Sequence, residues 1–257
     1  MRHVTLIAVA AALPWTAFAQ ADFNWSGTLS PGQTLEIKGV NGSIRAELAS
    51  GNVIEVSARK TAERSDPASV RIEVVPSAEG VTICSVYPSD AGEQNGCSPG
   101  KGHRSSVRDN DVKVDYTVKV PAAIRFAPKT VNGGVTALGL RSDIDAASVN
   151  GNVKIGTNGL AHAATVNGSI EATMGTPSWN GTLDFTTVNG SIDLTLPAAT
   201  GADVRATTVS GDLASDFPMT VNGRFGGRSM TGRIGAGGHE LKLTTVNGAI
   251  TLHQGAL

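Results

Sequence analysis

A six-residue phrase, Thr-Val-Asn-Gly-x-Φ with an apolar residue at Φ, recurs along the chain and constrains its fold more than any other feature. Asn and Gly accept positive φ at little steric cost, so each Asn-Gly pair predicts a tight corner in the backbone. After each corner, apolar residues alternate with polar ones, as in Ile170, Ala172 and Met174, and this period of two predicts a half-buried strand. The predicted structural corners are Asn41-Gly42, Asn132-Gly133, Asn150-Gly151, Asn167-Gly168, Asn189-Gly190, Asn222-Gly223 and Asn247-Gly248, with a serine variant at Ser210-Gly211.

Two all-β architectures fit this repeat. An Asn-Gly pair between alternating strands is a strong signal for a two-residue β-hairpin, which predicts a β-sandwich or meander. In a β-solenoid, each phrase instead forms the same corner of successive coils, with Val on Val and Asn on Asn about 4.8 Å apart. The corners at Val149, Val166, Val188 and Val209 are 17, 22 and 21 residues apart, which suits one coil with a second strand. We favour the solenoid, since hairpins give no reason for the same residues at every second turn.

The first 19 residues have the features of a cleaved secretory signal peptide. Arg2 and His3 precede an uncharged apolar run from 4 to 13, and Ala17-Phe18-Ala19 supplies small residues for cleavage. The apolar run is too short to span a bilayer, and no later segment is long and apolar enough to anchor the chain. The sequence therefore predicts an exported protein without a transmembrane segment, located in the periplasm, at the cell surface or secreted. We expect residues 20–257 to form a single β-solenoid domain.

An irregular insert at about 85–110 interrupts the strands. It is rich in Gly, Ser, Asp and Pro and contains Cys97, while Cys84 stands in the strand before it. Two cysteines in an exported protein predict a disulfide, here one that clamps the insert. Just before the insert, the apolar runs at 70–75 and 81–87 predict a β-hairpin.

The chain carries no recognisable catalytic motif, and we expect no catalytic residue, metal or cofactor. Its five histidines are scattered, and it has neither an H-E-x-x-H motif nor an acidic calcium loop. A carbohydrate-active β-helix enzyme would need two or more carboxylates brought together. The candidates are Asp143, Asp145, Asp184 and Asp193, which alternate with core residues like ordinary outward strand positions. The net charge of −1 provides no large basic face, so nucleic acid is not an expected partner.

Two interruptions of the repeat, at 175–181 and 215–238, predict loops that project from the coils and form a contact surface. Trp179 is the one large aromatic residue expected on such a loop, and it is therefore the candidate ligand contact. The alternative is a tryptophan that folds back over the edge of a coil.

The repeated Thr-Val-Asn-Gly-x-Ile corner behind a signal peptide resembles the bacterial adhesin-like β-solenoid family, a domain of unknown function. The resemblance covers most of the mature chain and is best from Thr130 to Leu252. It implies a β-solenoid in the cell envelope. Repetition without catalytic residues favours a non-enzymatic binding or structural module whose partner is an envelope polysaccharide or a protein. The alternative is a carbohydrate-active β-helix enzyme that acts on an envelope or extracellular polysaccharide.

Overall fold

In the computed structural model of the chain, the structure describes residues 22–89, 95–100, 106–222 and 227–255. The predicted signal peptide and Gly223 lie outside these ranges. Within them the chain forms strands and one short 3₁₀ turn, Pro67–Ser69, and it has no α-helix. The all-β prediction is confirmed.

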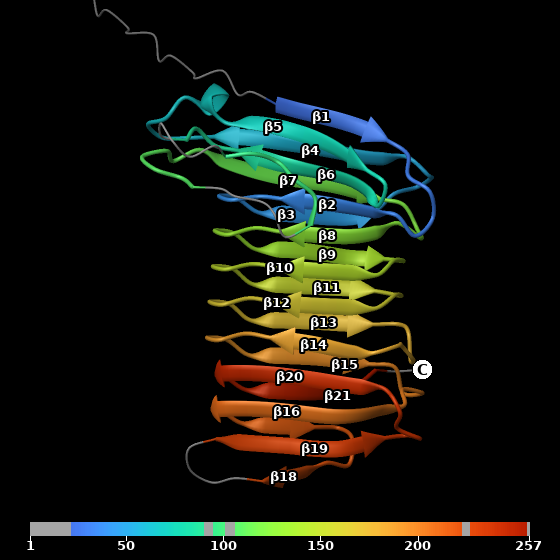
Figure 1. Cartoon of the computed structure of the whole chain (residues 1–257). Helices are drawn as coiled ribbons and strands as arrows, with labels where there is room; N and C mark the ends of the chain where they lie inside the picture. Colours follow the sequence, from blue (N-terminus) through green and yellow to red (C-terminus); the bar gives the residue numbers. More distant parts are fainter. Residues whose placement is uncertain (1–21, 90–94, 101–105, 223–226, 256–257) are drawn as a thin grey trace, which may run out of the picture.

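The strands of the described ranges belong to two large mixed sheets that face each other (Figure 1). Sheet A contains, in spatial order, β1 (Asp22–Gly27), β4 (Ile54–Thr61), β7 (Lys113–Val120), β3 (Ile44–Leu48), β9 (Val135–Leu140), β11 (Val153–Thr157), β13 (Ile170–Met174), β15 (Ile192–Leu196), β21 (Ile250–Gln254) and β17 (Leu213–Ser215). Sheet B contains β18 (Thr220–Asn222), β19 (Arg228–Ile234), β16 (Ala202–Ser210), β20 (Glu240–Asn247), β14 (Thr182–Thr186), β12 (Ala161–Ala164), β10 (Ile144–Ala147), β8 (Arg125–Lys129), β2 (Thr34–Lys38), β6 (Gly80–Val86) and β5 (Arg71–Ser77).

Each coil of the stack gives one strand to each sheet. β8 lies in sheet B, the corner at Asn132 turns the chain, and β9 continues in sheet A. Strands of neighbouring coils pair in parallel and in register, so Ile170 has Val153 on one side and Ile192 on the other. The inward side chains of both sheets are buried in one continuous apolar core. The β-solenoid prediction is confirmed, and the hairpin alternative is wrong for these coils because their corners join strands of different sheets.

The amino-terminal part of the chain covers one end of the stack. The corners at Asn41 and Asn132 are direct neighbours although 91 residues separate them. Between these two corners the chain forms β4 and β7, which pair antiparallel at the end of sheet A, and β1 pairs with β4 at its edge. In sheet B, β5 and β6 form the predicted hairpin, with Arg71 opposite Val86.

The predicted disulfide between Cys84 and Cys97 is present, with the two Cα atoms 5.5 Å apart. It joins β6 to the irregular insert, which contains no strand in the described residues after Val86. The insert is thereby fixed to the outer side of sheet B.

The carboxy-terminal coils are not stacked in the order of the sequence. β20 and β21 come last in the chain, yet they lie between β14–β15 on one side and β16–β17 on the other (Figure 1). The corner at Asn247 therefore follows the corner at Asn189. Gly211 in turn lies beside Gly248 rather than beside Gly190. The expectation that successive phrases form successive coils is wrong here, because every coil offers the same pairing edges whatever its place in the chain.

The phrase at Asn222 is not a corner of the stack, so the prediction of a solenoid corner at Asn222-Gly223 is wrong. Asn222 ends β18, which pairs antiparallel with β19 and places Asn222 opposite Ser229. β19 also pairs antiparallel with β16, so this segment forms the far end of sheet B. Val221 and Asn222 are therefore strand residues here, not corner residues.

Candidate functional site

The corner repeat forms one edge of the stack, and the Thr or Ser that opens each phrase ties neighbouring coils together. In six phrases this side chain is buried, and its hydroxyl donates a hydrogen bond to the glycine carbonyl of the preceding corner of the stack. Thr187 Oγ1 lies 2.8 Å from Gly168 O, and Thr245 Oγ1 lies 2.9 Å from Gly190 O. The same bond is made by Thr130, Ser148, Thr165 and Thr208. A partly buried carbonyl at the turn is thereby given a hydrogen-bond donor.

The corner glycine is required for a reason that the sequence did not reveal. Among the described corner glycines only Gly42 has a positive φ, of 122°, so the expectation of positive φ at every corner is wrong. At Gly168, a Cβ atom would lie far closer than 3.0 Å to the carbonyl oxygen of Gly151. The corners at Gly133, Gly151, Gly190, Gly211 and Gly248 have the same close approach. Glycine is needed because the backbones of neighbouring coils touch.

The corner asparagines form a continuous amide ladder. Each Asn Nδ2 donates to the Asn Oδ1 of its neighbour at 2.8 Å. The ladder runs through Asn41, Asn132, Asn150, Asn167, Asn189 and Asn247. It uses one N–H and one lone pair of each inner amide, although an amide has two donors and two acceptor lone pairs. The other N–H and lone pair are thus left for a ligand or for water.

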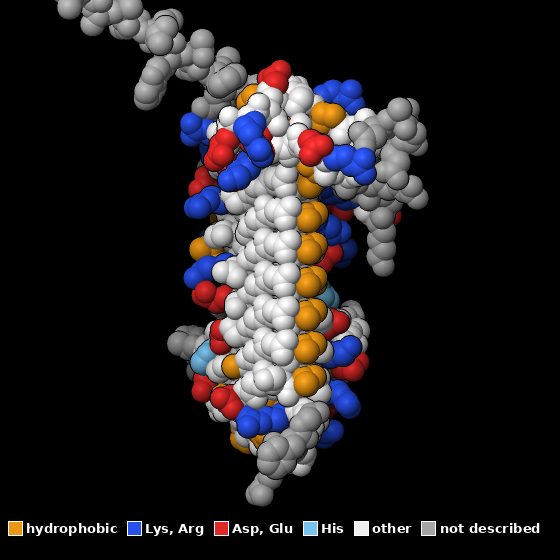
Figure 2. Space-filling view, turned by 90° about the vertical axis from the view of Figure 1, so that its left-hand side faces the viewer, with side chains coloured by type: hydrophobic (Ala, Val, Ile, Leu, Met, Phe, Trp, Pro, Cys, Tyr) orange, Lys and Arg blue, Asp and Glu red, His pale blue; other side chains and the backbone are white. Residues whose placement is uncertain are grey.

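The corner valines form an apolar column beside the amide ladder. They are between 37% and 57% exposed, and they make up most of the large exposed hydrophobic side chains of the described residues. The column contains Val131, Val149, Val166, Val188, Val246 and Val209. We call this column and the asparagine ladder together the corner stripe. Figure 2 shows the stripe as an orange column beside a white one, with charged side chains along its flanks and at its ends.

Trp179 does not form the exposed contact that its position in a loop predicted. It is only 4% exposed, and its Nε1 donates to the carbonyl of Glu240 at 3.1 Å. Its ring lies 5.4 Å from that of His239, centroid to centroid. Trp179 thus folds over the first residues of β20, which was the alternative reading, and it is not available to a ligand in this structure.

The candidate carboxylates lie on different parts of the surface. Asp193 is on sheet A, whereas Asp145 and Asp184 point outward from sheet B. Asp143 and Asp145 line a shallow groove of about 320 Å³ together with Arg125 and His162. Asp143 is already engaged there, since its Oδ1 accepts the Leu160 N–H at 3.0 Å and its Oδ2 lies 4.0 Å from Arg125 Nε. The structure therefore brings two of the four carboxylates to one groove and leaves the other two elsewhere.

A second shallow depression, of about 400 Å³, lies on the outer face of sheet A. Its polar lining comes from β1, β4 and β7 and includes Asn24, Ser57 and Thr117. Lys119 Nζ and Glu55 Oε2 also line it and pair with each other at 2.8 Å. These charges are therefore matched within the depression itself.

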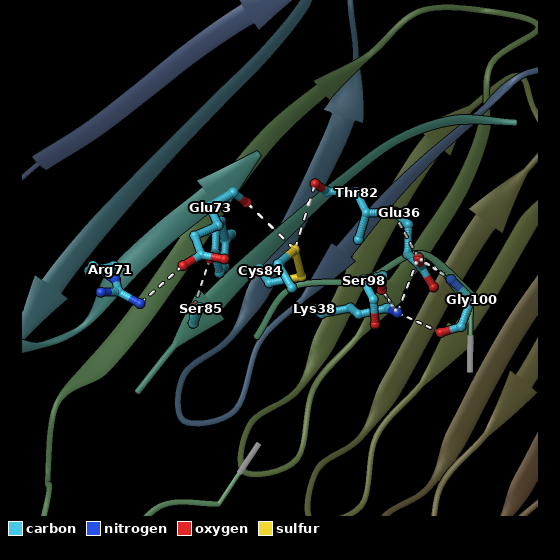
Figure 3. Close-up of a disulfide and its surroundings, with 11 residues drawn as sticks. Glu36, Lys38, Arg71, Glu73, Thr82, Cys84, Ser85, Ser98 and Gly100 are labelled. Atoms are coloured by element: carbon cyan, nitrogen blue, oxygen red, sulfur yellow. Dashed lines mark hydrogen bonds and ion pairs between the residues drawn. A yellow bond between two sulfur atoms is a disulfide. The ribbon is translucent and has the colours of Figure 1, made fainter. Parts of the chain in front are cut away.

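A buried charge cluster holds the disulfide-linked insert against sheet B, and sequence reasoning missed it. Glu36 and Lys38 are only 6% and 3% exposed, and Lys38 Nζ lies 3.3 Å from Glu36 Oε2. Lys38 also donates to the carbonyls of Ser98 and Gly100, as Figure 3 shows. The alternation of β2 predicts both side chains outward, and only the insert folding over them makes them buried.

The same cluster sets the charge state of Glu36. Burial pushes the pKa of this carboxyl up, but the hydrogen bond from Lys129, the N–H of Gly100 and the charges of Lys129 and Lys38 outweigh burial. The pKa therefore lies below its ordinary value, and Glu36 is ionised at neutral pH. Each buried charge of the cluster thus has a partner, as expected when buried ionic groups hold two segments together and do not bind a ligand.

Within the described residues, no group of three or more His, Cys, Asp and Glu side chains is placed to hold a metal ion. In the same part of the chain, no helix is long and apolar enough to cross a membrane.

The family model described as Toastrack DUF4097 matches residues 109–253, which is more than half of the chain. These residues include the stacked corners from Asn132 to Asn247. Among curated proteins, none matches the sequence.

Several solved structures resemble the fold at low identity. A putative cell adhesion protein from Clostridium sporogenes ATCC 15579 is 11% identical, with 91% of this chain and 100% of that chain covered and a TM-score of 0.48. A putative adhesin from Bacteroides fragilis NCTC 9343 is 12% identical, with coverage of 91% and 98% and a TM-score of 0.37. A putative adhesin from Parabacteroides distasonis ATCC 8503 is 10% identical, with the same coverage and a TM-score of 0.31. At these TM-scores the resemblance carries no argument about function.

Proposed function

Because the chain belongs to the Toastrack family, a stack of coils with one repeated corner, we propose that it is an exported, non-enzymatic envelope module that binds a polysaccharide along its corner stripe. The observation that carries this proposal is the stripe itself. It repeats an exposed valine and an asparagine amide on the five coils with corners at Asn132, Asn150, Asn167, Asn189 and Asn247, and none of its residues is ionisable.

The absence of charge in the stripe favours an uncharged ligand. An anionic polymer would be attracted by lysine or arginine side chains along its path, and the stripe offers only valine and asparagine. The amides supply donors and acceptors for the hydroxyl groups of a sugar. The valine column supplies an apolar surface for the C–H faces of the same sugars.

The dimensions of the stripe favour a slender ligand. Burial of a whole valine side chain contributes about 1.5–3 kcal/mol, which at about 25 cal/mol per Å² corresponds to about 60–120 Å² of apolar surface. Six valines that are about two-fifths exposed therefore offer on the order of 200 Å² of apolar surface to a ligand. A stable protein–protein interface buries about 800 Å² on each partner. The apolar part of the stripe is therefore much smaller than the area that a folded protein partner buries, whereas a single extended polysaccharide chain needs only a narrow track.

The sequence and the disulfide support export. A signal peptide of this form directs secretion, and a disulfide persists in oxidising compartments such as the periplasm and the cell surface. Labelling of intact and lysed cells with a membrane-impermeant amine reagent distinguishes the two locations. Labelling of intact cells would indicate the surface, and labelling only after lysis would indicate the periplasm.

The binding proposal is tested by co-sedimentation of the mature protein with insoluble neutral glucans, chitin and peptidoglycan, with an anionic polysaccharide for comparison. Val166→Glu places a charge in the middle of the stripe, and Val53→Glu is the matched control because Val53 is 48% exposed outside it. We expect Val166→Glu to lower the affinity at least tenfold and Val53→Glu to leave it unchanged. Equal binding by both variants, or no binding to any neutral polymer, would overturn the proposal.

The groove at Asp143 and Asp145 supports the alternative of a carbohydrate-active enzyme, because glycoside hydrolysis uses a pair of carboxyl groups. The test is release of reducing ends from the same polysaccharides. Activity in the wild type that Asp145→Asn abolishes would favour the enzyme over the binding module.

A further inference from the structure

The last coil of the chain occupies a slot between two coils that precede it in sequence. We call residues 239–254 the C-terminal coil; it comprises β20, the corner at Asn247 and β21. On one side it pairs with β14 and β15, and on the other side with β16 and β17. Leu241, Leu243, Ile250 and Leu252 of this coil are completely buried.

The C-terminal coil is held by the same kinds of hydrogen bond that join the other neighbouring coils of the stack. Toward the preceding coil, Asn247 Nδ2 donates to Asn189 Oδ1 at 2.8 Å and Thr245 Oγ1 donates to Gly190 O at 2.9 Å. Toward the following coil, Thr208 Oγ1 donates to Gly248 O at 2.9 Å. None of these bonds depends on the coil belonging to the same chain as its neighbours.

The serine variant of the corner explains why the C-terminal coil, and not the coil of Ser210, pairs with the coil of Asn189. If the coil of Ser210 lay directly on that of Asn189, Thr208 could still bond a glycine carbonyl. A serine has no amide, however, so Asn189 would lose its ladder partner. Asn247 supplies that partner, and Ser210 fits only at the end of the ladder. The slot therefore selects the C-terminal coil by its asparagine.

One glycine-rich connection tethers the C-terminal coil to the preceding strand. It runs from the end of β19 at Ile234, and Gly235, Gly237 and Gly238 in it have φ values of 54°, 72° and 97°. A connection of this kind can open by changing a few backbone angles, as hinges do. Asp203 fastens it in the closed form, since its Oδ2 accepts the Gly238 N–H at 3.0 Å.

The loop before β14 and the first residue of β14 both contact the inserted coil. Trp179 Nε1 bonds the carbonyl of Glu240, and Thr182 Oγ1 lies 2.6 Å from Glu240 Oε2. Both contacts join the coil to the part of the stack that comes before the slot. A coil from a second copy could make them equally well.

We propose that the C-terminal coil exchanges between two copies of this protein during folding. In the resulting dimer, residues 239–254 of each copy fill the slot between β14–β15 and β16–β17 of the other, with residues 235–238 as the hinge. Until the slot is filled, β15 and β17 present open edges, and an identical segment is the occupant that such edges accept best. Closed monomer and exchanged dimer contain the same pairings, so protein concentration during folding decides between them. This inference is independent of the proposed function.

The test uses cross-linking between two differently substituted copies of the full mature chain. Thr195 in β15 and His253 in β21 are register partners with outward side chains. One copy carries Thr195→Cys and the other His253→Cys; the two are unfolded, mixed and refolded under oxidising conditions at about 1 μM to about 1 mM. Thr195→Cys mixed with Thr173→Cys is the matched control, because those residues are also register partners but lie in coils that do not exchange. Peptide mass spectrometry identifies each link and separates it from mispaired native cysteines.

We expect a covalent heterodimer from the Thr195→Cys and His253→Cys mixture, increasing with concentration and at least fivefold above the control mixture. A single chain with both substitutions should cross-link internally when refolded dilute, which establishes the register. If that chain links internally while the mixture gives no more heterodimer than the control at any concentration, the proposal is overturned. Failure of the internal link would overturn it as well, because the slot would not be occupied as described.

Discussion

Replacing Gly168 by alanine tests the claim that the backbones of neighbouring coils touch at the corners. Gly168 has an ordinary φ, yet a Cβ atom on it would collide with the carbonyl oxygen and carbon of Gly151. That carbonyl is fixed on its other side, since the buried hydroxyl of Thr165 donates to it at 2.9 Å. The collision can be relieved only if two coils move apart, which would stretch the asparagine ladder and the strand pairing beside it.

The expected loss is large for the addition of one methyl group. Overpacking a well-packed interior costs about 1–3 kcal/mol, occasionally more. Here both colliding groups are backbone, which cannot change rotamer, so we expect about 3 kcal/mol. For a domain of this size, 1 kcal/mol shifts the melting temperature by about 2–4 °C, which gives a decrease of about 6–12 °C.

Thermal unfolding followed by circular dichroism measures this shift, and two other glycines serve as controls. Gly51 has no positive φ, and a Cβ atom on it would meet no other atom within 4 Å, so Gly51→Ala should stay within about 0.5 kcal/mol of the wild type. Gly181 has equal space but a φ of 75°, so Gly181→Ala should lose about 1–2 kcal/mol from backbone strain alone. If Gly168→Ala melts like Gly51→Ala, the close approach of the corners is wrong.

Three single contacts give further predictions. Thr245→Val removes a buried hydroxyl that bonds the carbonyl of Gly190 and should cost about 1–2 kcal/mol in chemical denaturation. Thr244→Val removes a buried hydroxyl without a partner in the described structure and should be neutral or stabilising. Replacing Cys84 and Cys97 together by serine should cost about 3 kcal/mol, and reductant should then have no further effect on unfolding. Hydrogen bonds from backbone N–H groups, above all that of Ser65, hold the pKa of the Asp111 carboxyl well below its ordinary value of 3.8. The ionised carboxylate therefore contributes its full stabilisation above pH 3.8, and this stabilisation is lost as the pH falls below 3.8 toward the pKa of the folded state. The difference in melting temperature between wild type and Asp111→Ala should therefore shrink in acid; a constant difference down to about pH 2 would contradict this assignment.

Local patterns in the sequence were sufficient for the elements and for the general architecture. Alternation after each Asn-Gly pair predicted strands such as the one through Ile170, Ala172 and Met174, which the structure has as β13 (Ile170–Met174). The cysteine pair predicted the disulfide, and the runs around Pro76 predicted the β5–β6 hairpin. The strands and the hairpin depend on residues that are neighbours in sequence, and two cysteines allow only one intramolecular disulfide. The sequence alone could therefore predict these features.

Burial by distant segments could not be predicted in the same way. Lys38 alternates like an outward strand residue, and it is buried only because the insert at Ser98 folds over it. Trp179 stands in an interruption of the repeat, and it is buried because β20 passes beneath it. In both cases the covering segment lies about 60 residues away in the chain, beyond the reach of any local pattern.

The sequence by itself determined that corners recur, that strands follow them, and that valine and asparagine repeat on one edge. Only the tertiary structure decided the order of the coils and the reason for the glycines. Because the phrases have nearly the same sequence, their coils offer similar pairing edges. The local sequence therefore does not specify which coils become neighbours. The choice comes from contacts between coils, such as an amide ladder that accepts Asn247 beside Asn189 and leaves Ser210 for the end.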